Sequence, residues 1–182
     1  FEMKEAYAML KEDEKKVKSF LITKGIDEKE ISFSSVYIRK DFRSQNDGNG
    51  NYSQYFNGYV LDESVIIESK NIQKVETISK DIAQLIDQGI ELNSNAPRYY
   101  YSKLKDLKVE LLAKAAADAN IRASTIAKNS KSSLGGLLKS NMGIFQITGQ
   151  NTDEDYSYGG AFNTSSINKT ASITVKAEYQ IK

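Results

Sequence analysis

The sequence contains no cysteine and no histidine among its 182 residues. Without cysteine there is no disulfide framework, no thiol nucleophile and no zinc–thiolate site. Without histidine, Ser–His and Cys–His catalytic pairs and the usual zinc and non-haem iron centres are also excluded. Only enzymes that use carboxylate, lysine or tyrosine chemistry remain, so we expect no enzymatic activity, no cofactor and no metal centre.

Excess charge and long apolar runs are also lacking. Lys and Arg total 25 against 24 Asp and Glu, so no global field favours nucleic acid or an anionic membrane as a partner. No apolar run approaches the roughly 20 residues of a transmembrane helix. The sequence has no recognisable signal peptide and begins with Phe1 rather than Met. We interpret this start as trimmed or preceded by an unseen segment, which leaves a removed export signal open.

Apolar residues recur three, four or seven positions apart in three stretches, which predicts three helices. The first covers about 3–24 and ends at Gly25, and the second covers about 72–88 and ends at Gly89. The third covers about 102–129, with Ser102 as its expected N-cap. Its inner face is expected to comprise Leu104, Leu107, Leu111, Ala115, Ala119, Ala123 and Ile126.

Stretches rich in β-branched and aromatic residues predict strands over 31–39, 58–69, 90–101, 142–148 and 170–181. The last alternates apolar and polar residues, which is typical of a half-buried antiparallel strand. With 40% hydrophobic residues, the chain suits one compact domain or two lobes with a shared core. We predict a single α+β domain over 1–182, with helices packed on one face of a mainly antiparallel sheet.

A short internal repeat is visible, because 21–26 (LITKGI) is similar to 85–90 (LIDQGI). One interpretation is that both segments carry the same common helix-end signal. The other is a duplicated unit of one helix and its strands.

Several polar segments are weighed as binding sites. The acidic run 153–155 offers oxygen ligands to Ca²⁺ or Mg²⁺ but lacks EF-hand spacing, and 47–51 (DGNGN) lacks a downstream bidentate glutamate. We interpret them as a solvated loop and a hairpin turn. Gly135 and Gly136 follow a helix, which favours an exit turn over a phosphate cradle. The segment 149–169 is too long for an idle loop, so it is expected to be disordered or to contact a partner.

Tyrosine and phenylalanine gather in two places, and these are the candidate interface residues. Neighbouring residues of a strand point to opposite faces, so one face of each cluster is expected in the core and the other at a subunit or helix interface. Packing within the core alone is the alternative. Base stacking would need interleaved basic residues, and Arg98 and Lys103 are too few. The residues are Tyr52, Tyr55, Phe56, Tyr59, Tyr99, Tyr100 and Tyr101.

The order of these segments resembles the SIMPL-domain (YggE-like) family. The resemblance is carried by 20–26 with 30–31, by 58–60 with 64–67, and by 82–90. It continues through the alanine-rich stretch 111–128, through 133–135 and through 171–175, so it covers almost the whole chain. Family members usually begin with one or two strands ahead of the first helix, which this chain lacks. If they are missing, the sheet has an open edge that favours pairing with another chain.

The resemblance implies a bacterial protein that is exported to the periplasm or outer cell envelope. It also implies a homo-oligomer, in some members ring- or channel-like, and a link to oxidative-stress defence. No catalytic residues are established for the family, so none is transferred. We therefore expect a non-enzymatic envelope protein that self-assembles or binds a protein partner. The alternative is a small-ligand-binding or channel-forming module.

Overall fold

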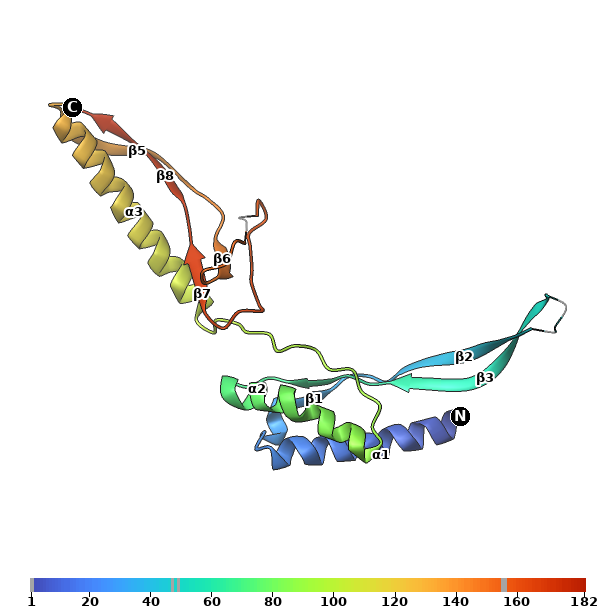
Figure 1. Ribbon diagram of the computed structural model, residues 1–182. Coiled ribbons are helices and arrows are strands. Elements are labelled where there is room, and N and C mark those ends of the chain that lie inside the picture. The colour runs from blue at the N-terminus through green and yellow to red at the C-terminus, as the bar shows by residue number, and fades with distance from the viewer. Residues whose placement is uncertain (1, 47, 49, 155–156) are drawn as a thin grey trace. The chain divides into compact units, whose positions relative to one another are not determined.

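The computed structural model in Figure 1 describes residues 2–46, 48, 50–154 and 157–182. Over these residues the chain forms three α-helices and four two-stranded antiparallel sheets, which confirms the α+β prediction. Two compact units are present, Phe1–Pro97 and Arg98–Lys182. That 1–182 act as one domain without its N-terminal strands stays a prediction.

The first unit consists of an N-terminal helix, four strands and a second helical segment. The core contains the buried residues Leu21, Ile26 and Ile78, with half-buried apolar side chains around them. The predicted second helix changes at Ile82 from an α-helix to a 3₁₀-helix and ends before Gly89, as expected. The elements are α1 (Met3–Thr23), η1 (Glu28–Glu30), β1 (Ile31–Phe33), β2 (Tyr37–Asn46), β3 (Tyr52–Asp62), β4 (Val65–Ile67), α2 (Ile72–Asp81) and η2 (Ile82–Gln88).

The second unit places a long helix along a two-stranded ribbon (Figure 1). The predicted inner face of this helix is half-buried from Leu104 to Ala123, but Ile126 is exposed and Ala127 is buried in its place. The predicted cap at Ser102 is wrong, because the helix begins at Leu104 and Lys103 precedes it. The elements are α3 (Leu104–Asn129), β5 (Leu134–Met142), β6 (Gln146–Gly149), β7 (Lys169–Ser172) and β8 (Val175–Ile181).

The two copies of the short sequence repeat are two helix ends with the same hydrogen bonds. Ile26 N–H donates to Leu21 O over 3.0 Å, and Ile90 N–H donates to Leu85 O over 3.2 Å. Gly25 and Gly89 have φ values of 85° and 79°, as this type of helix end requires. The similarity between the segments therefore reflects a shared way of ending a helix within the first unit.

A larger repetition relates the strands of the two units. In the first unit β1 pairs with β4 and β2 with β3, and in the second β5 pairs with β8 and β6 with β7. In each unit the four strands follow a helix and form one long two-stranded ribbon. In each ribbon, both sides leave the strand conformation once, between the first strand pair and the second. Ser34 N–H donates to Ser64 O across the first interruption, and Gly143 N–H donates to Thr174 O across the second. Both units thus build the same helix-plus-ribbon order.

Three details of the predicted strands need correction. The described strands form separate pairs rather than one continuous sheet. The predicted strand 90–101 is absent, since these residues take no regular structure and pair with no described strand. Gly135 and Gly136 lie inside β5 and not in an exit turn. A Cβ on Gly135 would lie 2.9 Å from Gln180 Cβ, so the close approach of β8 explains this glycine.

The long segment between β6 and β7 folds back over β6. Ile147 N–H donates to Ala161 O over 2.7 Å, and Asn163 N–H donates to Ile147 O over 2.8 Å. The buried side chain of Gln146 donates to Ser157 O over 2.8 Å and accepts a hydrogen bond from Ala161 N–H. In its described residues, the segment predicted to be disordered or partner-bound is therefore held by hydrogen bonds within its own unit.

No helix within the described part of the chain is both long and apolar enough to cross a lipid bilayer.

Candidate interaction surface

Strands β2 and β3 form a hairpin that we call the arm (residues 37–46 and 52–62). Their register runs from Tyr37 opposite Asp62 to Asn46 opposite Tyr52. Between the strands, Gly48 and Gly50 have φ values of 79° and 90°, which glycine adopts without strain. The hairpin turn predicted over 47–51 lies between two antiparallel strands, which end at Asn46 and begin again at Tyr52. Asp47 and Asn49 lie outside the described residues, as does Phe1.

A β-bulge divides the arm into an inner and an outer half. Asp41 pairs with Gly58 and Phe42 with Phe56, so Asn57 is the extra residue. The side-chain amide of Asn57 donates to Asp41 Oδ2 over 2.5 Å and holds the bulge closed. Gly58 is buried with φ 135°, a conformation that favours glycine. The sequence therefore determines where the strand bends.

An aromatic row crosses the bulge on one face of the arm. The rings of Phe42 and Phe56 have centroids 5.9 Å apart, and those of Phe56 and Tyr59 are 5.2 Å apart. Both pairs meet edge to face, which is a favourable geometry for aromatic rings. Phe56 and Tyr59 are among the residues predicted from the sequence, whereas Phe42 was not predicted. Counting outward along both strands from the hairpin connection would have paired Phe42 with Phe56.

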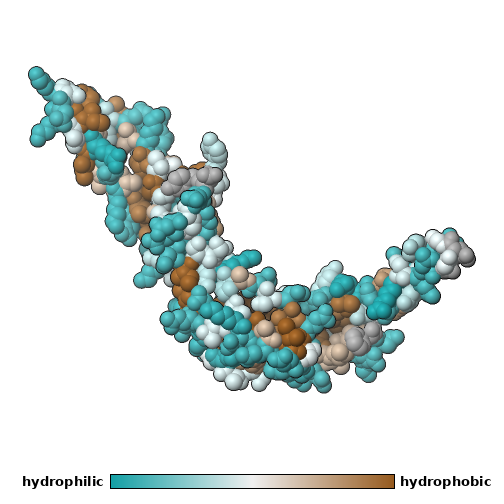
Figure 2. All heavy atoms as spheres, viewed as in Figure 1, coloured by the Kyte–Doolittle hydropathy of each residue, from teal (hydrophilic) through white to brown (hydrophobic). Residues whose placement is uncertain are grey.

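The outer half of the arm is exposed to solvent. Tyr52, Tyr55 and Phe56 are 75%, 47% and 45% exposed, whereas Tyr59 is half-buried. Figure 1 shows this half extending beyond the first turn of α1. In Figure 2 it is mostly pale or teal, because tyrosine and polar residues cover it rather than aliphatic ones. Of the first predicted cluster, the structure thus places Tyr52, Tyr55 and Phe56 together on one accessible strand.

The two strands of the arm differ in charge. Strand β2 carries Arg39, Lys40, Asp41 and Arg43, and Arg39 Nε lies 3.4 Å from Asp62 Oδ2. Strand β3 has no charged residue and no proline from Tyr52 to Leu61. Each strand has only the other as a partner over the described residues, so each has one free edge.

The second predicted cluster, Tyr99 to Tyr101, belongs to the other unit and lies on no strand. Tyr99 is half-buried and its N–H donates to Thr164 O over 2.7 Å. Tyr100 and Tyr101 are 64% and 50% exposed. The alternation of faces expected for a strand therefore does not apply to these tyrosines, and their interface role stays a prediction.

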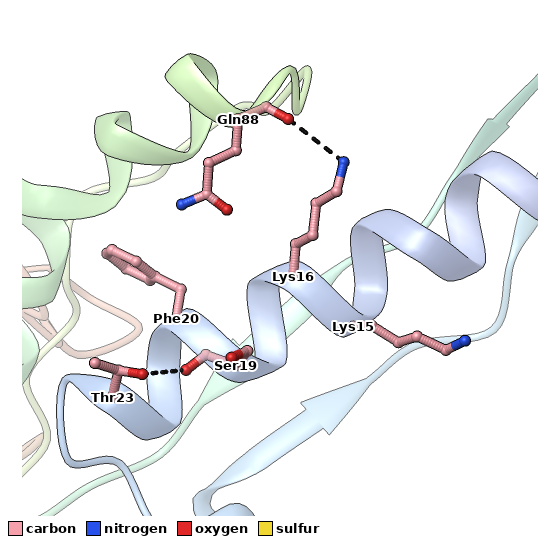
Figure 3. Close-up of a pocket in the computed structure, with 6 residues that line it drawn as sticks. All are labelled: Lys15, Lys16, Ser19, Phe20, Thr23 and Gln88. Atoms are coloured by element: carbon pink, nitrogen blue, oxygen red, sulfur yellow. Dashed lines mark hydrogen bonds between the residues drawn. The ribbon is translucent and has the colours of Figure 1, made fainter.

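A shallow depression of about 450 Å³ lies between α1 and η2 (Figure 3). Lys16 Nζ donates to Gln88 O over 3.4 Å, and Thr23 Oγ1 donates to Ser19 O over 2.9 Å. The side chain of Lys15 extends away from the other labelled residues, so the polar groups do not converge on one point (Figure 3). This geometry gives a small ligand little enclosure.

The acidic run 153–155 is described only as far as Glu154. One oxygen of Glu154 accepts from Gly149 N–H over 2.7 Å, and the other accepts from the side-chain amide of Asn163. These hydrogen bonds, that of Gly149 first, lower the pKa of the Glu154 carboxyl below its ordinary value. Its oxygens are thus engaged in holding the loop. In the described ranges, no three acidic side chains are grouped as metal ligands would be.

Comparison with protein families shows a relationship over nearly the whole chain. The SIMPL family model, described as a protein of unknown function (DUF541), matches residues 2–180. A search of curated proteins found none that matches. Because the family model covers nearly the whole chain, the resemblance expected from the order of helices and strands is confirmed. The chain belongs to the SIMPL family.

Proposed function

We propose that this chain is a non-enzymatic protein of the cell envelope that works by self-assembly. The observation that carries the proposal is the exposed arm. It presents large aromatic side chains to solvent on a hairpin with two free strand edges. Isolated two-stranded hairpins are marginally stable in water, and exposed edges are templates for pairing with another chain. An arm of this kind gains stability when a further strand joins it.

Apolar residues are also exposed along the second unit. Leu137, Leu138 and Met142 of β5 are 56%, 69% and 63% exposed. Figure 2 shows apolar side chains at the surface of both units, interspersed with polar ones. Scattered exposed apolar residues are normal, but several on one strand of a two-stranded ribbon favour contact with a protein. The envelope location and the link to oxidative-stress defence follow from the family resemblance alone.

The test is the solution mass of the chain, measured by light scattering after size exclusion over a wide range of concentration. Self-assembly predicts a mass that rises with concentration to a defined multiple of the 20.4 kDa chain. A mass of one chain at every concentration would sink the proposal and turn the search to a separate partner or a ligand.

A further inference from the structure

The free edge of β3 lacks the features that usually protect a strand edge. Natural sheets protect exposed edges with lysine and other charged residues, with proline, or with a covering helix or loop. On β2 the charged residues Arg39, Lys40, Asp41 and Arg43 supply this protection. On β3 the run from Tyr52 to Leu61 (YSQYFNGYVL) has neither charge nor proline. The difference marks β3 as the edge that is built to be paired.

The outer half of β3 is the part that is accessible. Gly58 is buried and Tyr59, Val60 and Leu61 are half-buried, and α1 contacts this strand. The residues before the bulge, Tyr52 to Phe56, are all exposed. In a β-strand, alternate residues direct their N–H and C=O groups to the same side, so the outer half presents backbone donors and acceptors that β2 does not use.

We propose that residues 52–56 of β3 pair in antiparallel orientation with the same residues of a second copy, about a two-fold axis. The two arms then form one four-stranded sheet. This inference rests on the proposed self-assembly and names the surface that mediates it. Two-fold pairing makes each surface meet itself, so it suits a strand without charge. The same pairing through the outer half of β2, residues 42–46, would bring Arg43 close to its own copy, and like charges near each other are destabilising.

The side chains of residues 52–56 fit such a contact. Tyrosine buries its ring while its hydroxyl stays hydrated or finds a hydrogen-bond partner, and it is enriched at protein interfaces. Tyr52 and Phe56 lie on one face of β3 and Tyr55 on the other, by the alternation of the strand. Both faces of the joined sheet therefore carry aromatic rings across the new strand pair.

The test uses single cysteines, since the native chain has none and each variant then carries one thiol. Cysteine is placed in turn at each position from 52 to 56, and at Ser44 and Gln45 on β2 as controls. Ser44 lies directly opposite Gln54, and Gln45 opposite Ser53. The controls thus place the thiol at matched positions on the other edge. Circular dichroism verifies that every variant is folded.

Two-fold pairing predicts a sharp result under mild oxidation. A disulfide needs Cα atoms about 4.4–6.8 Å apart, and a strand advances about 3.4 Å per residue. The two strands run in opposite directions, so a cysteine one residue from the axis is displaced in opposite directions in the two copies. The two thiols are then about 7 Å apart along the strand. A disulfide-linked dimer should form at one or two neighbouring positions of β3, fall sharply on either side, and stay absent for Ser44→Cys and Gln45→Cys.

A second pair of variants tests the same surface without a crosslink. Gln54→Lys places a positive charge on the β3 edge, and Ser44→Lys places the same charge on the β2 edge. We expect Gln54→Lys to weaken self-association about tenfold or more, and Ser44→Lys to change it less than threefold.

The failures of the two proposals are distinguishable. If the wild-type chain self-associates but β3 cysteines crosslink no better than β2 cysteines, the pairing through β3 is overturned and self-assembly stands. If the chain is a monomer at every concentration and no cysteine crosslinks, both proposals fail. A β3 strand that pairs with another protein would give this second result.

Discussion

Phe42 and Phe56 lie directly opposite each other across the arm, with ring centroids 5.9 Å apart. Phe56 also contacts Tyr59 on the far side of the β-bulge, so one side chain joins the outer and inner halves of the hairpin. We expect the aromatic row to stabilise the extended outer half of β3, which is the part proposed to meet another strand. This connects the packing of the arm to its proposed use.

Phe56→Ala should loosen the outer arm. The change removes both ring pairs, each worth roughly 0.5–1.5 kcal/mol, so the free energy of unfolding should fall by about 1–3 kcal/mol. Urea unfolding of the full chain measures it. Tyr52→Ala is the matched control, because Tyr52 is 75% exposed and should change stability by less than about 0.5 kcal/mol. Equal decreases in the free energy of unfolding of the two variants would contradict a structural role for the aromatic row.

Leu21→Ala should destabilise the first unit strongly. Leu21 is 1% exposed and packs with Ile26 and Ile78 in the core. Truncating a buried leucine costs roughly 2–5 kcal/mol, because apolar contact is lost and a cavity remains. The neighbouring residue Ile22 is 46% exposed, so Ile22→Ala should cost far less. Urea unfolding compares the free energies of unfolding of the two variants. A similar decrease for both would contradict a core position for Leu21.

Lys131→Gly should stabilise the second unit. Lys131 has φ 59° and occupies the helix-end position that Gly25 and Gly89 occupy in the first unit. A side chain in this left-handed conformation is unfavourable, so glycine should raise the free energy of unfolding by about 1 kcal/mol. Lys128→Gly makes the same change inside the last turn of α3 and should destabilise by about 0.5–1 kcal/mol. In thermal unfolding, the midpoint temperature should rise for Lys131→Gly and fall for Lys128→Gly. A lower midpoint for both variants would rule out this account of the helix end.

Glu154→Gln should reduce the pH dependence of stability in the second unit. The folded-state pKa of Glu154 is lowered mainly by the Gly149 N–H, so its ionised form stabilises the fold. This contribution is present above the ordinary value of 4.5 and is lost as the pH falls through the lowered pKa. The urea midpoint of the wild type should therefore fall more steeply with acid than that of the variant. Asp153→Asn removes the same charge one residue away but leaves the hydrogen bonds of Glu154 in place, so it is the control for loss of charge alone.

Helix boundaries were predictable from the sequence, because their signals are local. Gly25 and Gly89 end their helices as expected, and the stripe from Leu104 to Ala123 defines the packed face of α3. The expected N-cap at Ser102 is wrong, because α3 begins at Leu104 after Lys103, which makes no side-chain capping hydrogen bond.

Strand pairing was less predictable, because it depends on residues far apart in the sequence. Gly135 and Gly136 have the composition of a turn, and the approach of Gln180 from β8 explains why a strand has a glycine at position 135. The aromatic residues of 99–101 suit a strand, but no described strand pairs with them. The tyrosines of β3 were predicted from the sequence as candidate interface residues, and this stays a prediction. The pairing with β2 was needed to show which edge is charged and which is not.

The most direct test of the central claim is hydrogen–deuterium exchange of the wild-type chain at low and high protein concentration. Pairing between copies through β3 predicts that amides of residues 52–56 exchange more slowly at high concentration, while residues 42–46 of β2 and the helix α3 remain unchanged. If exchange over residues 52–56 is the same at both concentrations while the solution mass rises, assembly uses another surface. If neither the exchange nor the mass changes with concentration, self-assembly itself is contradicted.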